Sequence, residues 1–106
     1  MIKLNLPDYR LRLRKEEGKT YIYDDLRQRF VILTPEEWVR QHFVHYLMEH
    51  LGYPRELMMN EVTIQVGLTT KRCDTILYSR QLTPRVLIEY KAPHIRITDR
   101  VLQQIL

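Results

Sequence analysis

Residues 72–78, Arg-Cys-Asp-Thr-Ile-Leu-Tyr, and residues 85–91, Arg-Val-Leu-Ile-Glu-Tyr-Lys, decide the fold of this chain. Both runs have the length and the apolar content of β-strands, and only six residues separate them. We therefore predict two adjacent antiparallel strands joined by a loop at residues 79–84. With a loop of that length, Tyr78 lies opposite Arg85 at the closed end of the hairpin.

The open end of the same hairpin gathers charged side chains. In this register Asp74 lies opposite Glu89, and directly opposed side chains have Cβ atoms about 4.5–5.5 Å apart. Lys91 shares the face of Glu89 because side chains alternate along a strand. Two carboxylates around a gap suit a hard cation such as Mg²⁺, and a lysine beside them can help to activate water or stabilise charge on phosphorus. The alternative is a salt-bridged cluster without catalysis.

A helix is predicted before the hairpin. Thr34 as N-cap, Pro35 at the first helical position and Glu37 three residues after the cap are coinciding start signals. A glycine and a proline just beyond the helix end it at about residue 51. Its apolar stripe comprises Val39, Phe43, Tyr46, Leu47 and Leu51. Off this stripe are His42, His45 and Glu49, which we interpret as a solvated face rather than a metal site.

A β extension is predicted ahead of the helix. Residues 9–14 alternate strictly, with Arg10, Arg12 and Arg14 on one face and Tyr9, Leu11 and Leu13 on the other, which is typical of a half-buried strand. A turn at residues 15–18 leads to a return strand at 20–23, and residues 30–33 form another short strand.

From residue 34 onward the predicted order is a helix, three strands and a helix. The first strand is residues 61–66, with Val62, Ile64 and Val66 on one face, and Thr98 caps the last helix. We predict a mixed α/β chain, more narrowly of the α+β class, with a three-stranded, mostly antiparallel sheet. It divides into a β extension at residues 1–33 and a core at residues 34–106.

Length and composition limit the classes of function. A chain of 106 residues forms one compact domain, and its net charge of +4 is a mild bias toward anionic partners. The single cysteine, Cys73, excludes an internal disulfide and a four-cysteine zinc site. No apolar run approaches the roughly 20 residues of a membrane helix, so a cytoplasmic location without a membrane partner is expected. Without a glycine-rich phosphate loop, ATP binding is not supported.

Asp74, fourteen intervening residues and then Glu89-Tyr90-Lys91 resemble the D…(D/E)-x-K signature of the PD-(D/E)XK nuclease superfamily. The order of a helix and one strand before Asp74 agrees with that core. The blocks at residues 33–41, 52–54, 71–74 and 89–93 together resemble, more narrowly, the N-terminal nuclease domain of type I restriction enzyme R subunits. The resemblance implies a restriction-endonuclease-like core and a Mg²⁺-dependent DNA endonuclease that hydrolyses phosphodiesters with metal-activated water.

The resemblance also implies roles for single residues. Asp74 and Glu89, with the backbone carbonyl of Tyr90, would hold Mg²⁺ or, as a substitute, Mn²⁺, and Lys91 would be the catalytic lysine. Such enzymes often carry a further glutamate on the first helix. We favour Glu36, because it extends the core-facing stripe, whereas Glu37 is placed for the capping box and the solvent side. A first-turn acid that only complements the helix dipole is the alternative for Glu36. Cys73 stands where the superfamily has a proline.

DNA is the partner that this interpretation predicts, together with other restriction-system subunits. The predicted DNA contacts are Arg10, Arg12, Arg14, Lys71, Arg72, His94 and Gln104. The three N-terminal arginines have a second explanation as a solvated strand edge. Gln104 is assigned by the resemblance, with Gln103 as the other candidate.

Two further readings compete with an active nuclease. One is a catalytically inactive module that keeps the nuclease fold for DNA binding or subunit assembly. The other is a basic interaction domain with an incidental charge cluster. The chain ends at Leu106 within an apolar, helix-like pattern, so we expect a core that is incomplete at its C-terminus. An incomplete core would leave apolar surface exposed, and a second copy of the chain would cover it, so we expect a homodimer.

Overall fold

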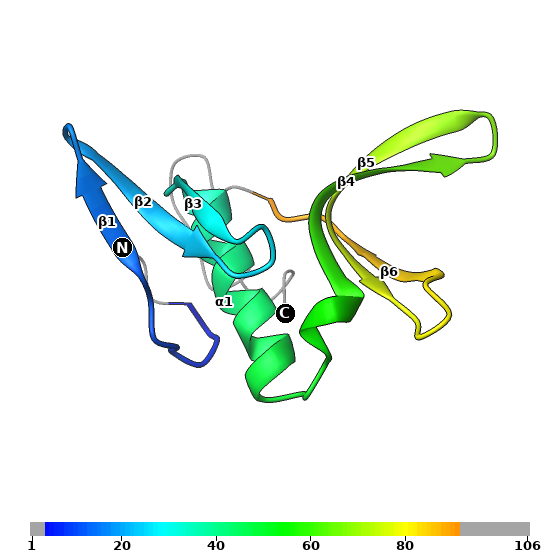
Figure 1. Ribbon diagram of the computed structural model, residues 1–106, viewed down its shortest axis with the longest axis horizontal. Coiled ribbons are helices and arrows are strands. Elements are labelled where there is room, and N and C mark those ends of the chain that lie inside the picture. Colours follow the sequence, from blue (N-terminus) through cyan, green and yellow to red (C-terminus); the bar gives the residue numbers. More distant parts are fainter. Residues whose placement is uncertain (1–3, 92–106) are drawn as a thin grey trace.

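The computed structural model describes residues 4–91 and has an α+β fold (Figure 1). In Figure 1, one helix runs between two three-stranded antiparallel sheets, whose strand orders are β1-β2-β3 and β4-β5-β6. The predicted class and the β extension are therefore confirmed. The elements are β1 (Leu13–Glu16), β2 (Lys19–Asp24), β3 (Arg29–Ile32), α1 (Pro35–Glu49), the 3₁₀ turn η1 (Arg55–Leu57), β4 (Met58–Val66), β5 (Thr69–Tyr78) and β6 (Pro84–Ile88). The predicted last helix lies outside the described residues.

Helix α1 begins where its capping signals predict. The Thr34 hydroxyl accepts a hydrogen bond from the Glu37 amide at 3.0 Å. The helix ends at Glu49, two residues earlier than expected, because the chain turns through a left-handed Gly52 with φ of 68°. The prediction that Leu51 belongs to the apolar stripe is wrong: this side chain lies beyond the last helical turn and is 61% exposed.

The hairpin of β5 and β6 has the predicted register along most of its length. Thr75 pairs with Ile88, and the next two pairs follow the same spacing. Two corrections apply at its ends. An irregularity after Leu77 pairs Tyr78 with Pro84 instead of Arg85. The strand β6 also stops at Ile88 rather than at residue 91. Beyond the strand, the Tyr90 amide donates to the Asp74 carboxylate at 2.8 Å.

The N-terminal strand differs from its prediction. Strand β1 starts only at Leu13, and all four of its residues are exposed, so a half-buried strand over residues 9–14 is wrong. Tyr9 has left the strand path, and its ring stacks on His45 with centroids 3.8 Å apart. The hairpin to β2 turns at Glu17 and Gly18, which both have positive φ, as the preferred two-residue turn requires. The later strands β2 and β3 lie close to their predicted positions.

The histidine face of α1 is not solvated as predicted. His42 is 3% exposed, and its Nδ1 lies 2.7 Å from the Trp38 carbonyl oxygen. His45 lies between the carboxylates of Asp25, at 2.7 Å, and Glu49, at 2.8 Å. This face is covered because the Tyr9 ring packs on both histidines and Asp25, in the turn after β2, contacts His45. Burial lowers the pKa of His42.

The β4–β5 hairpin reaches away from the helix, at the upper right of Figure 1. Strand β4 begins at Met58, three residues before the predicted strand. Val62 and Ile64 are partly covered, whereas Val66 near the hairpin tip is exposed. The burial of this strand thus depends on its distance from α1 rather than on alternation alone.

The core lies between α1 and the sheet of β4, β5 and β6. One cluster of buried side chains joins Val39 of α1 with Tyr90 and with Leu4 of the N-terminal segment. The second joins Val44 and Leu47 of α1 with Met58 of β4 and Leu77 of β5. Burying apolar surface in this way contributes about 25 cal/mol per Å². Within residues 4–91 no helix is long and apolar enough to cross a bilayer.

Candidate active site

Asp74 is held at the open end of the β5–β6 hairpin by two hydrogen bonds. Its carboxylate accepts from the Tyr90 amide at 2.8 Å, and its backbone carbonyl accepts from Arg40 Nη1 at 2.8 Å. One step beyond the Thr75–Ile88 pair, the same register sets Asp74 across from Glu89. The structure therefore brings the Asp74 carboxylate against the segment Glu89–Lys91, which the sequence singled out.

Glu89 and Lys91 are both exposed to solvent, on either side of the buried Tyr90. The Glu89 carboxylate receives the ammonium of Lys71 at 2.8 Å. This hydrogen bond and the Lys71 charge lower the pKa of Glu89, and the positive charge of Lys91 lowers it further. At neutral pH, Glu89 is therefore an ionised carboxylate whose nearest cation is Lys71.

The two glutamates at the start of α1 have distinct surroundings. Burial raises the pKa of Glu36, and the nearby charge of Asp74 raises it further, while Arg40 at 3.8 Å opposes the shift. Glu36 thus lies within electrostatic reach of Asp74. The prediction that Glu37 faces solvent is wrong. Its carboxylate is buried against Arg27 at 2.6 Å and Arg40 at 3.4 Å, so it does not close a capping box.

Arg40 is the centre of this site, and sequence reasoning missed it. Its side chain is 1% exposed. Besides the Asp74 carbonyl, the guanidinium binds the Glu61 carboxylate at 2.7 Å and lies 5.6 Å from the centroid of the Tyr90 ring. One signal could have found it, because Arg40 follows Glu36 by four positions and so shares its side of the helix.

Glu61 is the second residue that the sequence did not reveal. It has a left-handed backbone with φ of 57°, and it interrupts the β4–β5 ladder directly across from Asp74. Burial alone would raise the pKa of Glu61, but hydrogen bonds from Arg40 and Arg72 outweigh it and lower the pKa. No local sequence motif predicts this conformation, because left-handed backbone is uncommon for residues other than glycine.

A chain of buried hydrogen bonds reaches the site from the N-terminal sheet. The Tyr90 hydroxyl donates to Thr75 Oγ1 at 2.9 Å, and the Thr75 hydroxyl donates to Asn60 Oδ1 at 2.6 Å. The Asn60 amide then donates to the Asp24 carboxylate at 2.9 Å. Burial raises the pKa of Tyr90, so its phenol stays a neutral donor. This chain anchors the ring of Tyr90, whose backbone contacts Asp74.

The other predicted site residues are distributed over the molecule. Lys71 binds Glu89, and Arg72 binds Glu61 at 2.7 Å. Arg14 belongs to β1, and the sheet of β1, β2 and β3 lies on the opposite side of the molecule from β5 and β6 (Figure 1). Arg10 and Arg12 lie just before β1. His94 and Gln104 fall outside the described residues.

The donors at this site are suited to a hard cation. Carboxylate and carbonyl oxygens are the ligands that Mg²⁺ prefers, and Mg²⁺ is usually held by only one or two carboxylates, with water and phosphate completing its shell. Among residues 4–91, no group of three or more His, Cys, Asp or Glu side chains is spaced to hold a metal. The carboxylates of Asp74 and Glu89 are thus of the ligand type that Mg²⁺ prefers.

The helix, the antiparallel sheet and the acidic and basic side chains at its edge define an α+β domain with a charged surface site. The family model described as the type I restriction enzyme R protein N terminus matches residues 35–106. This is more than half of the chain, so the chain belongs to that family, and the resemblance to type I restriction enzyme R subunits is confirmed. A nuclease-related role in a restriction system follows from this membership. No curated protein and no solved structure matches the chain.

Proposed function

We propose that the chain is a Mg²⁺-dependent DNA endonuclease domain that hydrolyses phosphodiesters in a restriction system. The observation that carries the proposal is the approach of Asp74 to the Glu89–Lys91 segment, anchored by the bond from the Tyr90 amide to the Asp74 carboxylate. Family membership supports the same conclusion.

The carboxylates of Asp74 and Glu89 and the backbone carbonyl of Tyr90 would hold Mg²⁺, or Mn²⁺ in its place. The bound metal would supply the positive charge that activates water and offsets charge on the phosphodiester. For Glu89 to bind the metal, the Lys71 ammonium has to leave the Glu89 carboxylate. Both side chains are about half exposed, at 48% and 61%, and an ion pair of this kind exchanges at little free-energy cost.

The protein residues have separate tasks in this proposal. The Tyr90 amide orients the Asp74 carboxylate, and Arg40 fixes the backbone at Asp74. Lys91 presents a cation beside Glu89, where it positions water and stabilises negative charge that develops on the phosphate. Glu36 holds a proton more readily than an ordinary glutamate, so it is suited to proton transfer near Asp74.

A plasmid-nicking assay tests this function. In Mg²⁺ the chain should convert supercoiled DNA to the nicked form, and chelation should stop it. We expect Lys91→Ala and Asp74→Asn to lower the rate about 100-fold or more, as is usual when a positioned catalytic group is lost.

Lys71→Ala is the comparison variant, because Lys71 also lies beside Glu89. Its predicted contact is with DNA, so in this proposal it affects binding and not the chemical step. At saturating DNA it should cut at least as fast as the unaltered chain, since its removal frees the Glu89 carboxylate. The assigned roles would be contradicted if the Lys91→Ala variant still cut DNA. They would also be contradicted if Lys71→Ala lost as much activity as Lys91→Ala.

A second candidate is an inactive module that binds DNA or other restriction-system subunits. The ion pair of Lys71 with Glu89 favours it, because the pair neutralises one proposed metal ligand. DNA binding without Mg²⁺-dependent nicking, in both the unaltered chain and Lys71→Ala, would select this candidate.

A further inference from the structure

The outer face of the N-terminal sheet carries a cluster that the proposed site does not use. Side chains alternate across a strand, and the fully buried Ile22 and Asp24 mark the inner face of β2. Cross-strand pairing therefore sets a second group of residues together on the outer face. Arg12 precedes β1, but its carbonyl accepts from the Tyr23 amide at 2.9 Å, which continues the pairing by one position. We call this group the arginine–aromatic face; it consists of Arg12, Arg14, Glu16, Lys19, Tyr21, Tyr23, Phe30 and Ile32.

Two arginines of this face lie over aromatic rings. The guanidinium of Arg12 is 4.1 Å from the centroid of the Tyr23 ring, and that of Arg14 is 4.7 Å from the Phe30 ring. The two rings support each other edge to face at 5.2 Å. Stacking of this kind holds a guanidinium in place while its N–H groups remain able to donate in the plane. The arginines are thus pre-positioned donors rather than free side chains.

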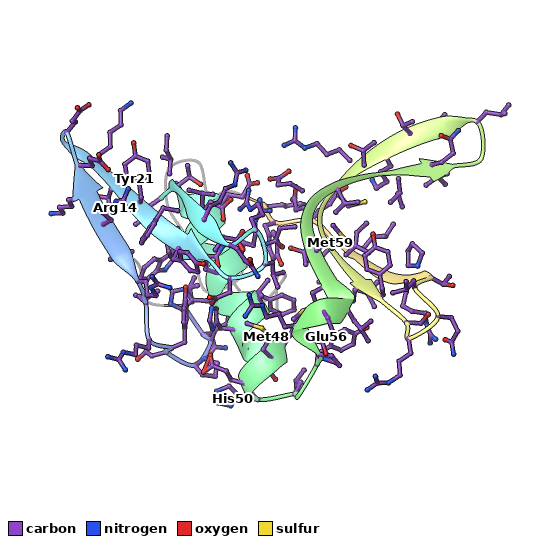
Figure 2. The ribbon with its side chains drawn as sticks, viewed as in Figure 1. Arg14, Tyr21, Met48, His50, Glu56 and Met59 are labelled. Atoms are coloured by element: carbon purple, nitrogen blue, oxygen red, sulfur yellow. The ribbon has the colours of Figure 1, made fainter. Side chains whose placement is uncertain are left out.

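The charge of the face is positive. The face carries three cationic side chains, Arg12, Arg14 and Lys19, and one acidic side chain, Glu16. Glu16 pairs with Arg14 at 3.2 Å. Both members of this pair are exposed, so an incoming anion can replace Glu16. Figure 2 shows Arg14 beside Tyr21 on the β1–β2 hairpin, on the opposite side of the molecule from β6.

We infer that the arginine–aromatic face binds the phosphate backbone of DNA. The inference rests on the proposed function for the identity of the polyanion. It adds a second contact surface for the substrate, on the opposite side of the molecule from β5 and β6 (Figure 1). Two observations support binding of DNA: the positive charge of the face complements the phosphates, and its guanidinium donors are held in place. Because Arg12 and Arg14 occupy the faces of Tyr23 and Phe30, the contacts are to phosphates rather than to bases, and binding is independent of sequence.

The test is binding of a short fluorescent DNA duplex to the full 106-residue chain, followed by anisotropy at several salt concentrations without Mg²⁺. Arg12→Ala and Arg14→Ala should each weaken binding several-fold and reduce the slope of log K against log salt by about 1. Glu16→Gln should strengthen binding. Arg80→Ala, an exposed arginine in the β5–β6 loop, is the matched control and should leave the slope unchanged.

Arg14→Lys refines the test, because lysine keeps the charge but loses the planar stack. It should retain most of the salt slope, which shows that a loss in Arg14→Ala is not a folding defect. Equal slopes in the unaltered chain and in both alanine variants would overturn the inference, as would an equal effect of Arg80→Ala or no duplex binding at all.

Failure of this inference and failure of the proposed function are distinguishable. Salt-dependent binding through Arg12 and Arg14 without any nicking leaves the inference standing and removes the endonuclease. Nicking that depends on Lys91 but not on Arg12 or Arg14, at limiting DNA, removes the inference and leaves the endonuclease.

Discussion

Arg40 shows how much one buried cation can organise. Its guanidinium contacts the carboxylates of Glu37 and Glu61 and the backbone of Asp74, which belong to three different elements. Its Nε is buried without a hydrogen-bond partner, so the pairing is incomplete even in the folded state. Charged groups tolerate such burial only when they are paired, and each contact therefore depends on the others.

The first prediction concerns the stability that Arg40 provides. Arg40→Met should lower the free energy of unfolding by about 3 kcal/mol or more, because it leaves buried carboxylates without their shared cation. Arg40→Lys should be less damaging, since it keeps the charge but cannot reach the Asp74 carbonyl and Glu61 together. Urea unfolding measures both changes.

Arg55→Met is the control for this prediction, because Arg55 is exposed in the 3₁₀ turn and its loss should change stability by less than about 0.5 kcal/mol. An Arg40→Met variant as stable as Arg55→Met would show that the guanidinium is not needed to compensate the buried acids.

At the scale of elements, α1 and the β5–β6 hairpin were the most predictable parts. The start of α1 follows from Thr34 and Pro35, because capping acts over a single turn. The register of the hairpin follows from its loop length and from alternation. Strand β1 was predicted poorly, because alternation signals a buried face only if another element covers it, and here the chain at Tyr9 turns away onto α1.

The second prediction tests the cap of α1. Thr34→Ala should destabilise the protein by about 1 kcal/mol, because the Glu37 amide loses its side-chain acceptor. Thr34→Ser keeps that acceptor and should stay within a few tenths of a kcal/mol of the unaltered chain. Thermal unfolding followed by circular dichroism compares them, and two variants of equal stability would contradict the role of the cap.

At the scale of the whole molecule, the N-terminal sheet and the core are joined by buried polar contacts. Asp24, at the end of β2, accepts from Asn60 of β4 and from Arg27. Burial would raise the pKa of Asp24, but these hydrogen bonds outweigh it and lower the pKa. His42 lies at a second junction, between the segment containing Tyr9 and the helix.

The third prediction is a dependence of stability on pH through His42. Since burial lowers its pKa in the folded state, the unfolded chain binds the proton more tightly. The stabilisation by neutral His42 is complete above about pH 6.5 and is lost as the pH falls through the lower pKa of the folded state. Urea unfolding at about pH 7.5 and pH 5.5 should show this loss, and His42→Gln should reduce it.

His50→Gln is the matched control, because His50 is an exposed histidine at the end of the same helix (Figure 2). It should keep the pH dependence of the unaltered chain. A His42→Gln variant with unchanged pH dependence would place the titrating group elsewhere.

The candidate site was only partly predictable from sequence. Asp74 and the Glu89–Lys91 segment could be found because one hairpin brings them together and their pattern resembles a known signature. Arg40 and Glu61 could not, because their contacts cross between elements: Arg40 and the Asp74 carbonyl are 34 positions apart. A charge pattern in sequence does not indicate whether water or another chain segment will cover it.

The sequence by itself determined the start of α1, the β5–β6 register and the family, because these depend on signals within a turn, a hairpin or a motif. Only the tertiary structure decided which charged groups are buried. Glu37, Arg40 and His42 all lie on α1 at positions that a helix alone would leave in water. They are buried because the segment containing Tyr9, the turn between β2 and β3, and β4 pack against them. Ion pairs and hydrogen bonds then compensate the lost hydration.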